Sequence, residues 1–69
     1  MSTAHEVGTT AGEIYAKLSG AENHTPLSKI VKTVNKDPRL VALALGWLLR
    51  EGKADIRRDG AKMMVKVLK

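Results

Sequence analysis

The side chains of this sequence that could do chemistry are mostly cationic, and they gather toward the C-terminal end of the chain. Residues 1–24 carry a net charge of −2, residues 25–49 carry +3 and residues 50–69 carry +4. The whole chain carries +5, with an isoelectric point near 9.9. Clustered lysine and arginine side chains attract the phosphates of nucleic acids, so this distribution favours a nucleic-acid-binding protein. A surplus of this size also serves solubility alone in many small proteins.

The residues that catalysis or metal binding would need are few and scattered. The chain has no cysteine, which excludes disulfides and thiolate zinc sites. His5 and His24 have no clustered carboxylates beside them in the sequence, so we expect no metal site. No serine has a histidine at a spacing that suggests a general base, and no glycine-rich phosphate loop follows a strand. We therefore expect no catalytic residues, no cofactor and no enzymatic activity.

The length of the chain, 69 residues, predicts a single domain over residues 1–69. The longest apolar run, Leu40 to Leu49, is ten residues, far short of the roughly 18 that cross a membrane. The N-terminal residues lack the basic and apolar regions of a secretory signal. We therefore expect a soluble cytoplasmic protein without a membrane partner.

A first helix is predicted over about residues 7–19. Thr10 with Glu13 forms a capping box near its start, in competition with an earlier box at Thr3 and Glu6. Two glycines inside the segment each cost about 1 kcal/mol in a helix, which favours the later start. The apolar residues of one helical face are Val7, Ala11, Ile14 and Leu18.

Two more helices are predicted over about residues 26–34 and 38–51. Thr25 can cap the first of them, with Pro26 at its first position, and Asp37 can cap the second, with Pro38 following. Gly52 is suited to end the third helix. Two short helices joined by a tight turn form a helix-turn-helix arrangement.

The remaining segment is predicted to form a β-hairpin with strands at about 53–58 and 61–68. Asp59-Gly60 at its centre is a strong signal for a two-residue turn. Such a turn would pair Arg58 with Ala61, Ile56 with Met63 and Ala54 with Val65, and would put Met63 in the core and Met64 on the outer face. The predicted fold class is therefore α+β, a winged helix-turn-helix with a three-helix core followed by a C-terminal β-hairpin wing.

The segment 44–53, with the sequence ALGWLLREGK, resembles the end of the third helix in winged helix-turn-helix domains. More narrowly, it is similar to a family of small stand-alone prokaryotic winged-helix proteins of unknown function. Ala11-Gly12 followed by Tyr15 is similar to the pair that precedes an aromatic residue in that family. The resemblance covers nearly the whole chain. It implies a winged-helix fold and, by analogy, nucleic-acid binding, but no particular ligand or role.

One hypothesis is a DNA-binding protein that contacts mainly phosphates, with weak sequence specificity, as in some transcriptional regulators. The third helix supports the emphasis on phosphates, because residues 40–49 hold no charged or amide side chain that could read a base edge. Amide groups at the start of that helix could add to a phosphate site. The residues expected to contact double-stranded DNA are Lys29, Lys32, Lys36, Arg39, Arg57, Arg58 and Lys62.

The alternative hypothesis is a protein-interaction or homodimerisation module that does not bind nucleic acid. Leu40, Leu43 and Trp47 form a second apolar stripe on the third helix, beside the stripe that faces the core. A helix that is apolar on all sides has to be covered on all sides. Either the wing and the first helix cover this stripe, or a second copy or another protein does.

Overall fold

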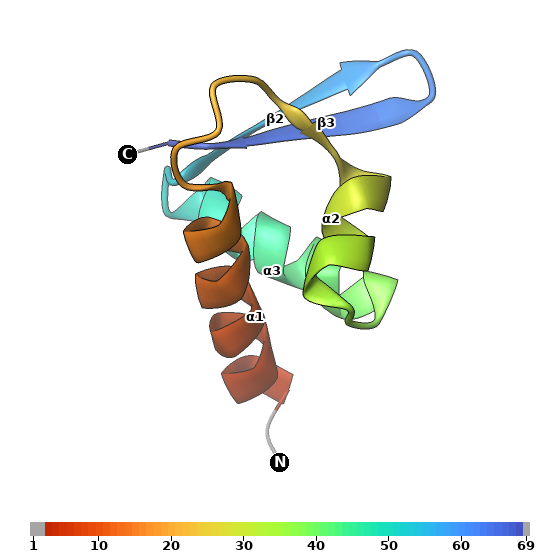
Figure 1. Ribbon diagram of the computed structural model, residues 1–69. Helices are drawn as coiled ribbons and strands as arrows, with labels where there is room; N and C mark the ends of the chain where they lie inside the picture. Colours follow the sequence, from red (N-terminus) through yellow and green to blue (C-terminus); the bar gives the residue numbers. More distant parts are fainter. Residues whose placement is uncertain (1–2, 69) are drawn as a thin grey trace.

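The computed structural model describes residues 3–68, which form three helices and a three-stranded antiparallel sheet. The elements in chain order are α1 (Thr3–Leu18), β1 (Thr25–Pro26), α2 (Leu27–Val34), α3 (Pro38–Arg50), β2 (Ala54–Asp59) and β3 (Lys62–Val67). The strands lie in the order β1-β3-β2, so that β3 is central. Figure 1 shows the three helices on one side of the sheet, with the turn of the β2–β3 hairpin on the same side of the molecule as α2. This arrangement confirms the predicted α+β fold class.

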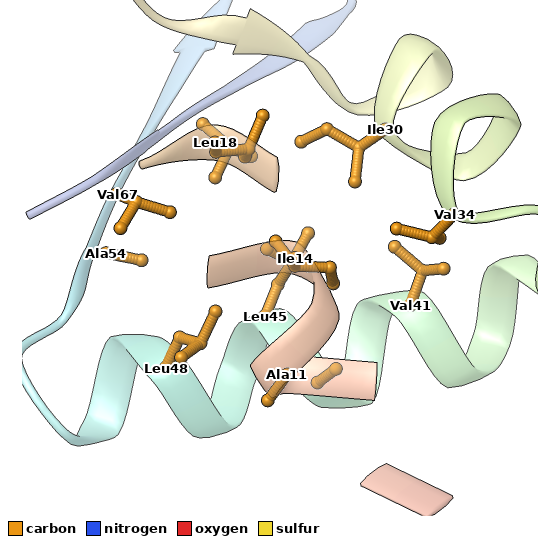
Figure 2. Packing of buried hydrophobic residues seen from close by; sticks show 12 residues of the cluster. Ala11, Ile14, Leu18, Ile30, Val34, Val41, Leu45, Leu48, Ala54 and Val67 are labelled. Atoms are coloured by element: carbon orange, nitrogen blue, oxygen red, sulfur yellow. The ribbon is translucent and has the colours of Figure 1, made fainter. Parts of the chain in front are cut away.

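The core lies where α1 crosses α3 beneath the sheet. Figure 2 shows Ile14 and Leu45 in the middle of the cluster, with α2 residues to one side and the sheet residues to the other. Ile14 and Val41 are fully buried. The buried apolar residues are Ala11, Ile14, Leu18, Ile30, Val34, Val41, Ala44, Leu45, Leu48, Ala54, Val65 and Val67. No helix within residues 3–68 is both long enough and apolar enough to span a lipid bilayer.

Helix α1 begins at Thr3, earlier than the predicted start near residue 7. Gly8 and Gly12 lie inside the helix, on its exposed side. The helix tolerates them because contact between its apolar face and α3 supplies stability that intrinsic propensity does not. Thr10 is consequently in the middle of α1 and fully buried, instead of capping its first turn.

Helix α3 has the two ends that the sequence predicts. Asp37 caps it by accepting a hydrogen bond from the backbone N–H of Arg39 at 2.8 Å, with Pro38 at the first helical position. At the other end, Gly52 has a φ of 71°. The N–H of Gly52 donates to Leu49 O and that of Lys53 to Leu48 O, which is the Schellman pattern of a helix terminated by glycine.

Strand β1 is absent from the prediction. Thr25, predicted as a helix cap, instead pairs with Val65 of β3, and Pro26 is the cap residue of α2 with φ −60° and ψ 139°. The ring of Pro26 disfavours helical geometry at Thr25, and a proline without an N–H is compatible with the edge of a sheet. Helix α2 therefore begins at Leu27, one residue later than predicted.

The hairpin register also differs from the prediction. Asp59 pairs with Lys62 and Ile56 with Val65, so the two turn residues are Gly60 and Ala61. Of these two, only Gly60 has a positive φ, at 63°, as a type II′ turn requires, whereas the predicted turn needs positive φ at both central residues. The register is shifted by two residues, which leaves every side chain on the face that was predicted for it.

The shift changes the surroundings of both methionines of β3. Met63 pairs with Arg58 near the turn and is 38% exposed, so the expectation that it fills the core beside Ile56 is wrong. Met64 is half-buried, because β1 places Pro26 next to it in the sheet. The core position that was expected for Met63 is occupied by Val65.

The hydroxyl of Thr10 is a weak point in this core. Thr10 is fully buried and its Oγ1 has no hydrogen-bond partner among the described residues. A buried polar group without a partner costs about 1–3 kcal/mol. We expect Thr10→Val, which replaces the hydroxyl by a methyl group of similar size, to raise the free energy of unfolding by about 1 kcal/mol in urea titrations. Thr9→Val, at the exposed neighbouring position, is the control. An equal effect of both variants, or destabilisation by Thr10→Val, would contradict the interpretation.

Candidate nucleic-acid interface

The seven predicted DNA-contacting residues lie on three parts of the structure. Lys29 and Lys32 are on the exposed side of α2. Lys36 and Arg39 flank the turn between α2 and α3. Arg57, Arg58 and Lys62 belong to the hairpin. Three of these seven cations form ion pairs with carboxylates.

Lys36 is paired with α1. Its Nζ lies 3.3 Å from Oε1 of Glu13, and both side chains are about one-third exposed. The pair joins the first helix to the turn after α2. Lys36 is therefore held by an acidic partner within the fold, which reduces the positive charge it offers to a phosphate.

Arg39 is paired with the residue that caps its own helix. Its Nη2 and Nε donate to the Asp37 carboxylate at 2.8 and 3.2 Å, in addition to the backbone N–H bond of the cap. These hydrogen bonds lower the pKa of Asp37 and raise that of Arg39. The Asp37 carboxylate thus occupies the position at the start of α3 where the sequence suggested a phosphate.

The carboxylate of Asp55 in β2 has two side-chain partners, His24 and Arg57. Its Oδ2 lies 2.7 Å from Nε2 of His24 and accepts a bond from Nε of Arg57 at 3.3 Å. The hydrogen bond with His24 is the main cause of a lowered pKa of Asp55, and the charge of Arg57 adds to it. His24 and Asp55 are 31 residues apart, so no local pattern predicts the contact. Among residues 3–68, no group of three histidine or acidic side chains could hold a metal ion.

The other four cations lie on α2 and the hairpin, and two of them line a groove between these elements. The groove has a volume of about 540 Å³, and Lys32 and Lys62 line it from opposite elements. Lys29 lies one helical turn before Lys32, and Arg58 pairs with Met63 of the groove wall. Among the described residues, these four side chains make no ion pair. We call Lys29, Lys32, Arg58 and Lys62 the α2–hairpin surface.

The walls of this groove are otherwise apolar or neutral. No carboxylate lines it, although Asp59 pairs with Lys62 across the hairpin and lies close to its rim. The remaining lining residues are Pro26, Leu27, Ser28, Val31, Pro38, Ala61 and Met63. The sequence alone does not predict this groove, because the groove depends on the hairpin register and on the short strand β1.

The second apolar stripe of α3 is left largely uncovered. Leu43 and Trp47 are each 54% exposed, while Leu40 is half-buried. Within the described residues, neither the wing nor α1 covers this second apolar stripe. The side of α3 that points away from the core therefore offers apolar groups, and its only long polar side chains are Arg39 and Arg50 at the two ends.

The arrangement defines a class of protein. Helices α2 and α3 joined by a tight turn, with α1 packed across α3 and a C-terminal antiparallel hairpin, constitute a winged helix domain.

The particular family follows from comparison with known proteins. The family model described as a winged helix-turn-helix domain (DUF2582) matches residues 1–67, and the chain belongs to that family. It is also similar to the uncharacterized protein MJ1608 of Methanocaldococcus jannaschii, with 35% identity over 63 residues, or 90% of each chain. The resemblance to a small winged-helix family of unknown function is thereby confirmed.

The contacts of Asp55 predict how stability depends on pH. A carboxyl group with a lowered pKa in the folded state stabilises the fold at pH values above its unfolded pKa of about 3.9. That contribution is lost as the pH falls through the folded pKa. We expect the free energy of unfolding of Asp55→Asn to fall less steeply than that of the wild type between about pH 5 and pH 2.

Urea unfolding at a series of pH values measures this difference. Asp59→Asn in the same strand is the control, since Asp59 makes no ion pair with the described residues, and it should follow the wild-type curve. Parallel pH profiles for wild type and Asp55→Asn would show that the His24–Asp55 contact does not stabilise the fold.

Proposed function

We propose that the protein binds double-stranded DNA, mainly through phosphates and with weak sequence specificity, in the manner of a small accessory or regulatory DNA-binding protein. The observation that carries the proposal is the α2–hairpin surface, where four cations make no ion pair with the described residues and two of them, Lys32 and Lys62, line one groove. A concentration of free cations on one side of a winged helix domain matches the charge of a DNA backbone.

The composition of α3 supports contacts to phosphates over contacts to bases. A helix that reads the major groove needs donors and acceptors such as arginine, lysine, asparagine or glutamine at its exposed positions. The corresponding positions here include Ala42, Leu43, Gly46 and Trp47. Phosphate contacts position a protein on the duplex without reading its sequence, so weak specificity follows.

The α2–hairpin surface offers more than one kind of donor to a phosphate. Lys32 and Lys62 provide charge from two sides, and Ser28 adds a hydroxyl at the groove wall. The first amide groups of α2 have no side-chain cap, because Pro26 occupies the cap position. In this proposal, the backbone of the duplex runs along the groove between α2 and the hairpin.

The three paired cations have smaller parts in this proposal. Arg39 and Arg57 have highly exposed side chains, 89% and 72%, and can add a phosphate contact by leaving Asp37 and Asp55. Lys36 is more enclosed and joins α1 to the turn. We therefore expect Lys36→Gln to affect stability as well as any binding of DNA.

Binding to a random-sequence duplex at several salt concentrations tests the proposal. Fluorescence anisotropy should show affinity that falls with salt, with a logarithmic slope of about 0.9 per phosphate contact. Lys29→Gln, Lys32→Gln and Lys62→Gln should each weaken binding on all sequences and reduce the slope by about 1. A second duplex of different sequence should give nearly the same affinity.

Lys17→Gln is the matched control, because Lys17 is an exposed lysine on α1 without an ion pair among the described residues and outside the groove. It should leave both the affinity and the salt slope almost unchanged. Absence of binding at low salt, or equal losses for Lys17→Gln and Lys62→Gln, would overturn the proposal.

A further inference from the structure

We infer that the groove between α2 and the hairpin, together with a second hollow beside α3, binds a single small amphipathic anion, a molecule with an elongated apolar body and one anionic group. In the proposed complex, the anionic group lies between Lys32 and Lys62, and the apolar body extends toward α3. Binding of this ligand does not depend on binding of DNA. Only the competition between the two, given below, rests on the proposed function.

The second hollow extends the groove toward α3. It has a volume of about 180 Å³, and its walls include Ala42 and Gly46 of α3 and Ile56 of β2. Leu27 and Met63 line both this hollow and the groove of about 540 Å³, so the two spaces adjoin at these side chains. We call the groove and the hollow together the cleft. Its size is that of a site for a small molecule, since such sites measure about 300–1,000 Å³.

Polar side chains line only one part of the cleft. Every residue that lines the second hollow is apolar or glycine. The polar lining residues, Ser28, Lys32 and Lys62, all belong to the groove. Asp59 lies across the hairpin from Lys62 but is not among the lining residues. Two lysines on opposite walls favour an anionic group, whereas the hollow favours a chain or ring without charge, because an unpaired charge there would lose its hydration.

A phosphate of DNA uses only the polar part of the cleft. It can contact the lysines and the serine hydroxyl, but it gains nothing from the apolar walls. Leu27 and Val31 are half-buried and Met63 is 38% exposed, so these side chains still have apolar surface in contact with water. An occupant with an apolar body covers that surface and gains free energy from doing so. An amphipathic anion therefore complements the whole cleft.

The ligand and a DNA phosphate share the same two lysines. If the protein binds DNA as proposed, the amphipathic anion competes with the duplex for Lys32 and Lys62. The concentration of such a molecule would then control how much of the protein is bound to DNA.

Titration of the full chain with decanoate in the absence of DNA tests the site. The expected result is saturable binding, with changes in NMR chemical shift at Lys62 in the groove and at Gly46 and Ile56 in the second hollow. Acetate carries the charge without the chain, and decan-1-ol carries the chain without the charge, so each should bind at least about fivefold more weakly. Binding of either control as tight as that of decanoate would overturn the inference, and so would shift changes confined to the lysines.

Gly46→Leu tests the second hollow. A Cβ atom at Gly46 would meet nothing within 4 Å, so a leucine side chain can be accommodated there and takes up space in the hollow. Leucine and alanine both favour a helix more than glycine does, so Gly46→Leu and Gly46→Ala should both fold, which thermal unfolding checks. Gly46→Leu should weaken decanoate binding by at least about tenfold, while Gly46→Ala, the matched control, should retain most of the affinity. Equal affinities of the two variants would overturn the inference.

Lys62→Gln tests the anionic end. It should weaken binding of decanoate by at least about threefold and leave binding of decan-1-ol unchanged. Lys17→Gln, an exposed position on α1 outside the cleft, should change neither. Equal losses for decanoate and decan-1-ol in Lys62→Gln would show that this lysine does not bind the anionic group.

Fluorescence anisotropy with a labelled duplex tests the competition. Decanoate should raise the apparent Kd of the wild type for the duplex, and it should have little effect on Gly46→Leu, which does not bind it well. Saturation of the cleft with decanoate without release of the duplex would overturn the competition. Absence of duplex binding would overturn the proposed function, whereas the decanoate titration without DNA would still decide the inference about the cleft.

Discussion

The packing of α1 across α3 is the constraint on which the rest of the structure depends. Ile14 is fully buried at this crossing, and Val41, Ala44, Leu45 and Leu48 supply the side of α3 that meets the core. The sheet completes the core through Val65 and Val67. The elements within residues 3–68 cover one side of α3 and leave the other side largely exposed. The exposed second apolar stripe of α3 is thus a direct consequence of how a small core is built.

The elements that could be predicted from the sequence are those with local signals. Asp37 followed by Pro38 marks the start of α3, Gly52 marks its end, and the apolar spacing of α3 identifies the side that faces the core. The hairpin register could not be predicted from apolar patterning, because a shift of two residues preserves both faces. Strand β1 is two residues long and Thr25-Pro26 fits a helix start equally well, so its pairing with β3 has no signature of its own.

The candidate site was predictable only as a set of charges. The sequence identifies the cations of α2 and the hairpin, but not which of them have partners. Lys36 finds Glu13 on another helix, and Asp55 finds His24 in a distant loop, and such contacts exist only once the chain has folded. Of the seven cations that the sequence singles out, the structure pairs three with carboxylates and leaves four without an ion pair among the described residues, two of which line a groove. It also separates this groove from the second apolar stripe of α3, so the charged and the apolar surfaces can act independently.

The order of the strands has a consequence for how the molecule can meet others. Central β3 has both of its neighbours within the chain, and the two outer strands each resist the addition of a foreign strand. Strand β1 is very short and contains Pro26, while β2 carries Asp55, Arg57, Arg58 and Asp59 along its length. Charged side chains, proline and short length are the means by which natural sheets avoid edge-to-edge aggregation. Both edges of this sheet therefore disfavour pairing with a strand of another chain.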